Sequence, residues 1–435
     1  MYRRIKNNSQ PRAMFRSNSI KIENQTERIG DHSVLQKDER CGASIFNISY
    51  YKTLKKYFIF LGQSPSQTDL HSNINATLVI CINVSILLPS VFQMQLSLSK
   101  KDWDGVIESQ PHLITAALAI VKLLNLHLNR QNFKELFVSV KEEWEELKLA
   151  DELHYLDVLT ERGSKIAQLY RNVLLSYLVL FVSLPMLNPL LDIALPLNES
   201  RRRAQLLKVY YFVDGDEYFY SIYIHGTICA ISIILTIVSV DSLYMVIVHH
   251  ASGLFAVCGY KIRKATENNY VTKNGGALKG NGYQDFRQCV IVHNKAIKFF
   301  EFLDNLNRKN YLIQMGLNMI GISITAFQAV VHLHEPDQFF RYCVFFAGQN
   351  FHLFILSLPG QVLLDYSLDL ATNIYMSQWY QTPLEVQRLL RMMQIRSSKP
   401  CSLTAGGLYE MNIENFGMTF KTCMSYFTML LSMKQ

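Results

Sequence analysis

The amino-acid sequence predicts an all-α membrane protein with seven transmembrane helices, a cytoplasmic N-terminus and an extracellular C-terminus. Long apolar runs alternate with charged segments, although the mean hydropathy of the whole chain is only +0.07. Several runs approach the ~20 residues that a helix needs to cross a hydrocarbon core of about 30 Å. Lys and Arg are also distributed unevenly among the connecting segments, as in membrane proteins with a defined orientation.

The expected spans follow the apolar runs in chain order. They cover residues 77–98, 111–128, 172–197, 219–248, 311–333, 339–364 and 416–433. The fourth run is longer than a bilayer requires, so we expect its helix to continue into the cytoplasm. The seventh run is short, and its helix is expected to begin before the membrane, near Leu408.

The basic residues give the orientation. With the N-terminus inside, the inner segments 1–76, 129–171, 249–310 and 365–415 carry 32 Lys and Arg when Arg171 at the edge of a span is excluded, whereas the outer segments carry 7. This asymmetry predicts a cytoplasmic N-terminus, which is the inverse of a G-protein-coupled receptor. The cluster Arg201 to Arg203 lies on the outer side against this trend, beside a glycosylation sequon at Asn198.

The segments outside the spans have distinct characters. Residues 1–50 are polar and basic, which predicts a disordered cytoplasmic tail. Residues 51–62 have helical periodicity but half the length of a span, which favours a re-entrant or interfacial helix over the start of a soluble subdomain. Residues 249–310 are expected to form a cytoplasmic loop with a Gly-rich stretch and a helix, and residues 365–415 a cytoplasmic anchor region.

The chain has no motif for catalysis or for binding a cofactor. No nucleophile elbow, H-E-x-x-H or phosphate-binding loop occurs, and the histidines have no metal-ligand spacing. The eight cysteines form no CxxC pair, so we expect mostly reduced thiols. The net charge of +8 is spread between apolar runs, which favours membrane contact over nucleic acid. These observations argue against an enzyme and against a bound metal or cofactor.

The spans contain features that suit a small ligand. Pro185, Pro189 and Pro196 interrupt the third span, and kinked spans can leave a cavity. Aromatic residues gather at the outer ends of the fourth and sixth spans, where they form either an interfacial belt or a pocket for a mostly apolar ligand. On the second interpretation, the expected ligand-binding residues are Ala117, Leu184, Met186, Tyr223, Gly226, Phe345, Phe346 and Gln349. Asp241 and Lys421 also lie within spans, either as functional charges or as charges near the inner interface.

The C-terminal third carries a specific set of motifs. It contains G-Q-V-L-L-D from Gly360, the pair Trp379-Tyr380, R-S-S-K-P from Arg396, and a final helix with Ser425-Tyr426 followed by Leu430. This order closely resembles the signature of insect odorant receptors. Gustatory receptors end instead in T-Y followed by Q-F, and the odorant coreceptor has a longer second cytoplasmic loop. The chain therefore resembles an odour-tuning subunit.

The resemblance implies a channel and its partners. Members form tetramers around a pore lined by the seventh helix, and tuning subunits assemble with the odorant coreceptor in the plasma membrane of olfactory neuron dendrites. It implies an odour-gated, non-selective cation channel opened by a small volatile ligand. The gate positions correspond to Met429 and Met433, and Ser432 stands where the family has Gln. A homomeric channel of the gustatory type and, less favoured, a G-protein-coupled receptor remain as alternatives.

Overall fold

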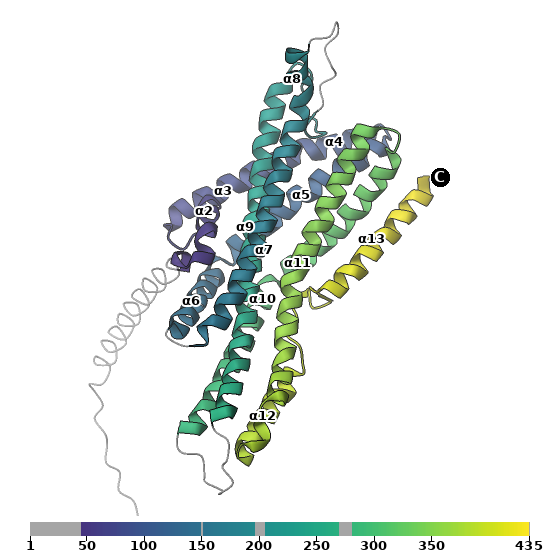
Figure 1. The fold of residues 1–435 in the computed structure, drawn as a ribbon. Helices are drawn as coiled ribbons and strands as arrows, with labels where there is room; N and C mark the ends of the chain where they lie inside the picture. The colour runs from purple at the N-terminus through teal and green to yellow at the C-terminus, as the bar shows by residue number, and fades with distance from the viewer. Residues whose placement is uncertain (1–44, 149–150, 196–204, 269–280, 435) are drawn as a thin grey trace, which may run out of the picture.

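The computed structural model describes residues 45–148, 151–195, 205–268 and 281–434 (Figure 1). Long α-helices dominate this part of the chain, and the predicted all-α membrane fold is confirmed. The α-helices are α2 (Lys52–Phe60), α3 (Asp69–Ser85), α4 (Leu87–Ser99), α5 (Trp103–Leu128), α6 (Arg130–Leu147), α7 (Leu153–Ser183), α8 (Leu187–Ala194), α9 (Phe219–Asn268), α10 (Asn281–Val331), α11 (Pro336–Met376), α12 (Leu384–Ser397) and α13 (Ile413–Lys434). The described residues also contain four 3₁₀ turns, η1 (Ile45–Asn47), η2 (Ser49–Tyr51), η3 (Leu184–Met186) and η4 (Trp379–Gln381). Two short strands are present, β1 (Thr404–Ala405) and β2 (Tyr409–Glu410).

Six helical stretches among the described residues are long and apolar enough to cross a membrane. They are Asp69–Ser99, Gly105–Leu128, Leu153–Ala194, Phe219–Asn268, Tyr283–Val331 and Gln338–Met376. The seventh expected span corresponds to α13, which has 22 residues and is not among these six stretches. Its helix begins at Ile413 and not near Leu408 as expected, because residues 404–410 form a hairpin. Lys421 and several hydroxyl residues lower the hydrophobicity of α13.

The N-terminal region differs in part from the expected tail. Residues 1–44 lie outside the described residues, but 45–51 form η1 and η2, and Ile45, Phe46 and Tyr51 are fully or almost fully buried. The ring of Phe46 contacts Phe58 of α2 and Phe137 of α6 at centroid distances of 6.2 and 5.9 Å. Apolar side chains therefore fold the end of the polar tail onto the bundle.

Two of the predicted spans contain a break. Residues 77–98 are divided between α3 and α4, which meet at Ile86. In the third span, α7 ends at Ser183, and η3, with Pro185 near its start, leads into α8. Proline lacks the N–H for helix hydrogen bonding, which explains this interruption. The expected Gly-rich stretch at 273–282 lies outside the described residues except for its last two, with which α10 begins. Asn198 and the arginines 201–203 also lie outside them.

The helices α9, α10 and α11 have 50, 51 and 41 residues. At 1.5 Å per residue each is far longer than a bilayer is thick, so they project beyond it together. The helix α7 lies against α9, where glycines allow close approach. A Cβ on Gly163 would lie 2.7 Å from the Cβ of His249, and one on Gly253 would lie 2.7 Å from the side chain of Leu156.

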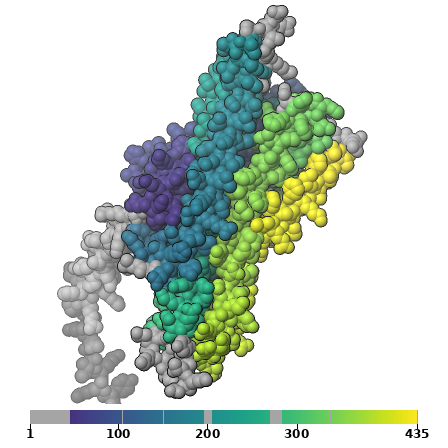
Figure 2. All heavy atoms as spheres, viewed as in Figure 1, coloured from purple at the N-terminus to yellow at the C-terminus, as the bar shows by residue number. Residues whose placement is uncertain are grey.

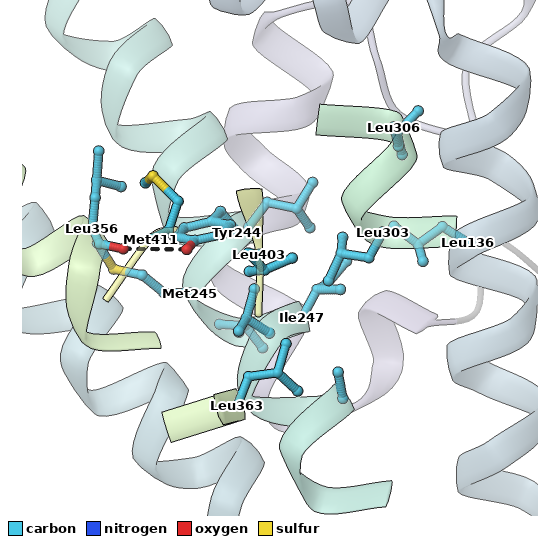
Figure 3. Packing of buried hydrophobic residues seen from close by; sticks show 14 of the residues in the cluster. Leu136, Tyr244, Met245, Ile247, Leu303, Leu306, Leu356, Leu363, Leu403 and Met411 are labelled. Atoms are coloured by element: carbon cyan, nitrogen blue, oxygen red, sulfur yellow. Dashed lines mark hydrogen bonds between the residues drawn. The ribbon is translucent and has the colours of Figure 1, made fainter. Parts of the chain in front are cut away.

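The hydrophobic core continues from the spans into the projecting part. Figure 3 shows side chains from α9, α10 and α11 packed around Leu403 and Met411, which flank the β1–β2 hairpin. The Tyr244 hydroxyl donates a hydrogen bond to the Leu356 carbonyl at 3.2 Å. The residues on either side of the hairpin are therefore held in the core, whereas Leu408 in its turn is exposed.

The hairpin leads directly into α13. Its turn contains Gly406 and Gly407 at φ of 66° and 75°, a conformation that favours glycine. Gly360 of α11 lies so close to the chain after β2 that a Cβ there would be 1.8 Å from the Met411 carbonyl oxygen. Asn412 then caps α13 by accepting a hydrogen bond from the Asn415 N–H at 2.8 Å. The α13 helix runs along the edge of the bundle with one side uncovered (Figure 2).

Candidate functional site

An aromatic cluster joins α5, α7 and α11. The ring of His112 lies 5.9 Å from both Phe181 and Phe345, and the ring of Tyr177 lies 6.1 and 6.4 Å from the same two rings. The guanidinium of Arg341 is 5.9 Å from the centroid of Phe181, within cation–π distance. Rings with a few polar groups at their edge suit a small, mostly apolar molecule.

The predicted ligand-binding residues lie near this cluster in part only. Phe345 belongs to it, and Gln349, one turn along α11, accepts a hydrogen bond from the Thr325 hydroxyl of α10 at 3.2 Å. Ala117 on α5 is half-buried. A Cβ on Gly321 of α10 would lie 2.9 Å from Gln349 and 3.5 Å from Ile114 of α5, so α5, α10 and α11 meet closely at this level.

The remaining predicted residues have other neighbours. Tyr223 of α9 donates a hydrogen bond to the Val182 carbonyl of α7 at 2.8 Å. A Cβ on Gly226 would lie 3.4 Å from Leu206, so this glycine borders the segment before α9. Leu184 is exposed, and Met186 is half-buried at the end of η3. These four residues are assigned to the α7–α9 side, where the ring of Tyr223 stacks on Phe219 at 6.2 Å.

Two surface hollows in the described part of the chain lie away from the aromatic cluster. One, of about 720 Å³, runs along the outer face of α3 between Asn73 and Ser85. The other, of about 520 Å³, lies between α6 and α10 and is bordered by Glu143 and Lys295. Neither hollow is lined by the predicted ligand-binding residues.

A polar network is buried at the centre of the bundle. Lys122 of α5 and Asp241 of α9 form an ion pair, and their side chains are 1% and 3% exposed. The other carboxylate oxygen of Asp241 accepts a hydrogen bond from the Tyr170 hydroxyl at 2.8 Å. The same hydroxyl lies 2.8 Å from Nδ1 of His352, whose Nε2 lies 3.3 Å from the Gln314 amide. Five helices, α5, α7, α9, α10 and α11, are thus joined through one set of polar contacts.

The sequence pointed to Asp241 but not to its partner. Asp241 is 2% exposed inside the bundle, so it does not lie at a solvated interface. Lys122 lies in the second apolar run and Asp241 in the fourth. One cation in one span and one anion in another was the only local sign that the two could form a pair. The pairing itself could not be predicted, because 119 residues separate the two positions.

The α13 helix has two different faces. Thr419 and Cys423 are buried, and the Ser323 hydroxyl of α10 donates a hydrogen bond to the Cys423 carbonyl at 3.3 Å. The opposite face is exposed along the whole helix. Its residues recur every three or four positions in the sequence. This face, called here the polar stripe, consists of Glu414, Met418, Lys421, Ser425, Thr428 and Ser432. Five of its six residues are polar or charged.

The predicted gate residues flank the polar stripe. Met429 and Met433 are 53% and 76% exposed and lie one turn apart near the end of α13. Ser432 belongs to the stripe itself, and Ser425 and Tyr426 of the family motif are also exposed. The other motif pair, Trp379 and Tyr380, forms η4 between α11 and α12 with their rings at 87°.

One pair of neighbouring residues links the aromatic cluster to α13. Phe345 faces His112 and Tyr177, whereas Phe346 contacts Phe420 of α13 at a centroid distance of 6.5 Å. Further along, Phe354 of α11 contacts Phe416 of α13 at 5.4 Å. A displacement of α11 at the cluster would therefore also move the rings that contact α13.

Comparison with known proteins gives consistent matches. A family model described as 7tm Odorant receptor matches residues 103–424. The chain is 22% identical to odorant receptor 9a of Drosophila melanogaster over 48% of this chain and 51% of that protein. It is 33% identical to odorant receptor 30a of the same species over 35% and 36%, and 22% identical to odorant receptor Or2 of Anopheles gambiae over 81% and 91%. The chain thus spans about half or less of the first two relatives and most of the third.

Among solved structures, the chain resembles the insect olfactory receptor OR5 from Machilis hrabei in complex with eugenol. The TM-score is 0.68 at 13% identity, covering 93% of this chain and 100% of that one. The structure of the same receptor described without eugenol gives a TM-score of 0.65, also at 13% identity. At this identity the likeness concerns the fold.

Proposed function

The chain belongs to the insect odorant receptor family, and from this premise we propose that it is the odour-tuning subunit of a ligand-gated, non-selective cation channel formed with the odorant coreceptor. The observation that carries the proposal is the polar stripe of α13. The hydroxyls of Ser425, Thr428 and Ser432 bond carbonyls of their own helix, but the charged groups of Glu414 and Lys421 would be costly in lipid. The stripe suits a helix that faces a water-filled pore between subunits.

The ligand in this proposal is a small volatile molecule held near Phe345. Its predicted contacts are Ala117, Phe345, Phe346 and Gln349, with Leu184, Met186, Tyr223 and Gly226 on the α7–α9 side. The rings of His112, Tyr177 and Phe181 favour an apolar or aromatic odorant. The eugenol complex of the receptor from Machilis hrabei supports this class of ligand.

The proposed mechanism is a shift between closed and open states. An odorant that binds the open arrangement more tightly raises the population of that arrangement. The neighbouring residues Phe345 and Phe346 would transmit the change, because one lies in the aromatic cluster and the other packs on Phe420 of α13. Met429 and Met433 would form the constriction, which excludes water when the helices are close together.

The gate proposal has a direct test. Met429→Ala combined with Met433→Ala shortens both side chains, so we expect a larger current without odorant. The measurement is whole-cell current before and after odour application in cells that also express the coreceptor. A closed-state current equal to that of the unmodified chain would contradict the assignment of these two residues.

The function as a whole is tested by odour-evoked current in cells that express the chain with and without an insect odorant coreceptor. We expect a fast current only with the coreceptor, unchanged by a blocker of G proteins. Current from this chain alone would indicate a homomeric channel of the gustatory type. A slow response that the blocker removes would overturn the channel proposal.

The proposal also includes location and orientation. The chain is a membrane protein, and we propose the plasma membrane of olfactory neuron dendrites with the N-terminus inside. The support is the excess of Lys and Arg in the segments assigned to the cytoplasm. An epitope tag at the N-terminus should be stained only after cells are permeabilised, and one at the C-terminus in intact cells.

A further inference from the structure

We propose that Lys421 sets the relative permeability of divalent and monovalent cations in channels that contain this chain. The inference rests on the proposed function, because it needs α13 to face the pore. It goes further by assigning one side chain an electrostatic role in the ion path. The effect would be to disfavour divalent cations relative to monovalent ones.

The position of Lys421 in the structure supports this role. It lies in the middle of the polar stripe, on the exposed face opposite the buried Thr419 and Cys423. No ion pair involves it within the described residues. The nearest carboxylate on the same stripe is Glu414, two turns earlier and about 10 Å away along the axis. The charge of Lys421 is therefore not neutralised by its own chain.

The rest of the stripe argues against contact with lipid. A lysine near the end of a span can extend its ammonium to the headgroups. Ser425, Thr428 and Ser432 continue the polar face for three more turns beyond Lys421. These hydroxyls donate to carbonyls of their own helix, which leaves their oxygens able to accept hydrogen bonds from water beside the charges of Glu414 and Lys421. Water along the whole stripe accounts for both observations.

The expected direction follows from Coulomb's law. A fixed positive charge repels a divalent cation twice as strongly as a monovalent one. At about 8 Å from the pore axis in a water-like medium, one such charge lowers the local concentration about twofold for a monovalent cation and about sixfold for a divalent one. Removing the charge should therefore raise the calcium-to-sodium permeability ratio by about two- to threefold.

The experiment measures reversal potentials of the odour-evoked current under calcium and sodium gradients, with the coreceptor present in every case. Lys421→Gln should raise the permeability ratio, and Lys421→Arg, which keeps the charge, should leave it unchanged. Lys100→Gln removes the same charge from the exposed end of α4 and serves as the matched control. An unchanged ratio in Lys421→Gln with normal odour-evoked current overturns the inference but leaves the proposed function intact.

A second measurement covers the case in which Lys421→Gln fails to reach the cell surface. In Lys421→Cys, a positively charged methanethiosulfonate reagent should lower the permeability ratio again, and a negatively charged one should raise it further. The unmodified chain treated with both reagents is the control for native thiols such as the exposed Cys81. The same response to both reagents would overturn the inference. Absence of odour-evoked current from the unmodified chain would overturn both the inference and the proposed function.

Discussion

At the scale of single residues, the ion pair between Lys122 and Asp241 is the most unusual feature of the bundle. Both side chains are almost fully buried, and Tyr170 and His352 complete the hydrogen bonding around them. A buried pair has little net effect on stability compared with apolar residues of similar size. Removing one partner is different, because it leaves the other charge buried without compensation.

This asymmetry gives a prediction for the pair. Lys122→Met or Asp241→Leu alone should destabilise the protein by about 3–5 kcal/mol, whereas the double variant should recover most of that loss. The measurement is surface expression together with the melting temperature of the detergent-solubilised protein. If the double variant is no more stable than either single one, the two charges do not depend on each other as the structure indicates.

A second residue-scale prediction concerns Phe346. Its ring packs on Phe420 of α13, next to the aromatic cluster. Phe346→Ala should shift the odour dose response, because it removes a predicted ligand contact and loosens the link to α13. The measurement is potency and the ranking of a panel of odorants with the coreceptor present. Unchanged potency and ranking would remove Phe346 from the site.

At the scale of elements, the contact between α11 and the β1–β2 hairpin positions α13. Gly360 faces the carbonyl of Met411, one residue before the cap of α13, and the Ile413 N–H donates a hydrogen bond to the Gln361 side chain at 3.2 Å. The close approach to Met411 therefore explains why the motif begins with a glycine. A residue with a side chain cannot occupy this position while the hairpin stays in place.

Gly360→Ala should separate α11 from the hairpin and impair channel function. Alanine favours helix more than glycine by about 1 kcal/mol, so any loss must come from the clash with Met411. Gly348→Ala on the same helix is the matched control, since a Cβ there meets nothing within 4 Å. Melting temperature and odour-evoked current are the measurements. Equal behaviour of the two variants would show that the close approach is unimportant.

The elements also show what the sequence could and could not predict. The helical membrane fold and the family followed from features local in the sequence, namely the apolar runs and the motifs from Gly360 to Leu430. The turns before Tyr51, η1 and most of η2, were missed, because a polar tail hides a few apolar residues that become buried. The pairing of Lys122 with Asp241 and the contact of Gly360 with Met411 depend on how distant segments pack. No local pattern encodes such packing.

At the scale of the whole molecule, apolar side chains remain exposed on the part of the chain that projects beyond the spans. They lie at the end of α11, on η4 and α12, and in the hairpin, namely Tyr375, Met376, Tyr380, Leu384, Met392, Ile395 and Leu408. By the predicted spans these residues lie between the sixth span, which ends at 364, and the seventh, which begins at 416. An exposed apolar patch of this kind usually marks contact with another protein. In the proposed channel, the neighbouring subunits of the tetramer would provide that contact.

Met392→Lys combined with Ile395→Lys should therefore prevent assembly without unfolding the chain, because both side chains are 63–65% exposed. Ser398→Lys adds a charge at the exposed end of the same helix and is the control. The measurement is co-purification with the coreceptor. Retained co-purification in the double variant would place the subunit contact elsewhere.

The buried ion pair also has a consequence for how the protein is made. Lys122 leaves the ribosome 119 residues before Asp241. At about 5–20 residues per second, the second span waits roughly 6 to 24 s for its counter-ion. During that time its ammonium has no partner inside the membrane. Until the fourth span is inserted, the second span must therefore stay beside the translocation machinery, or the ammonium of Lys122 must reach water. Biosynthetic yield is then governed by the order of translation as well as by the stability of the finished bundle.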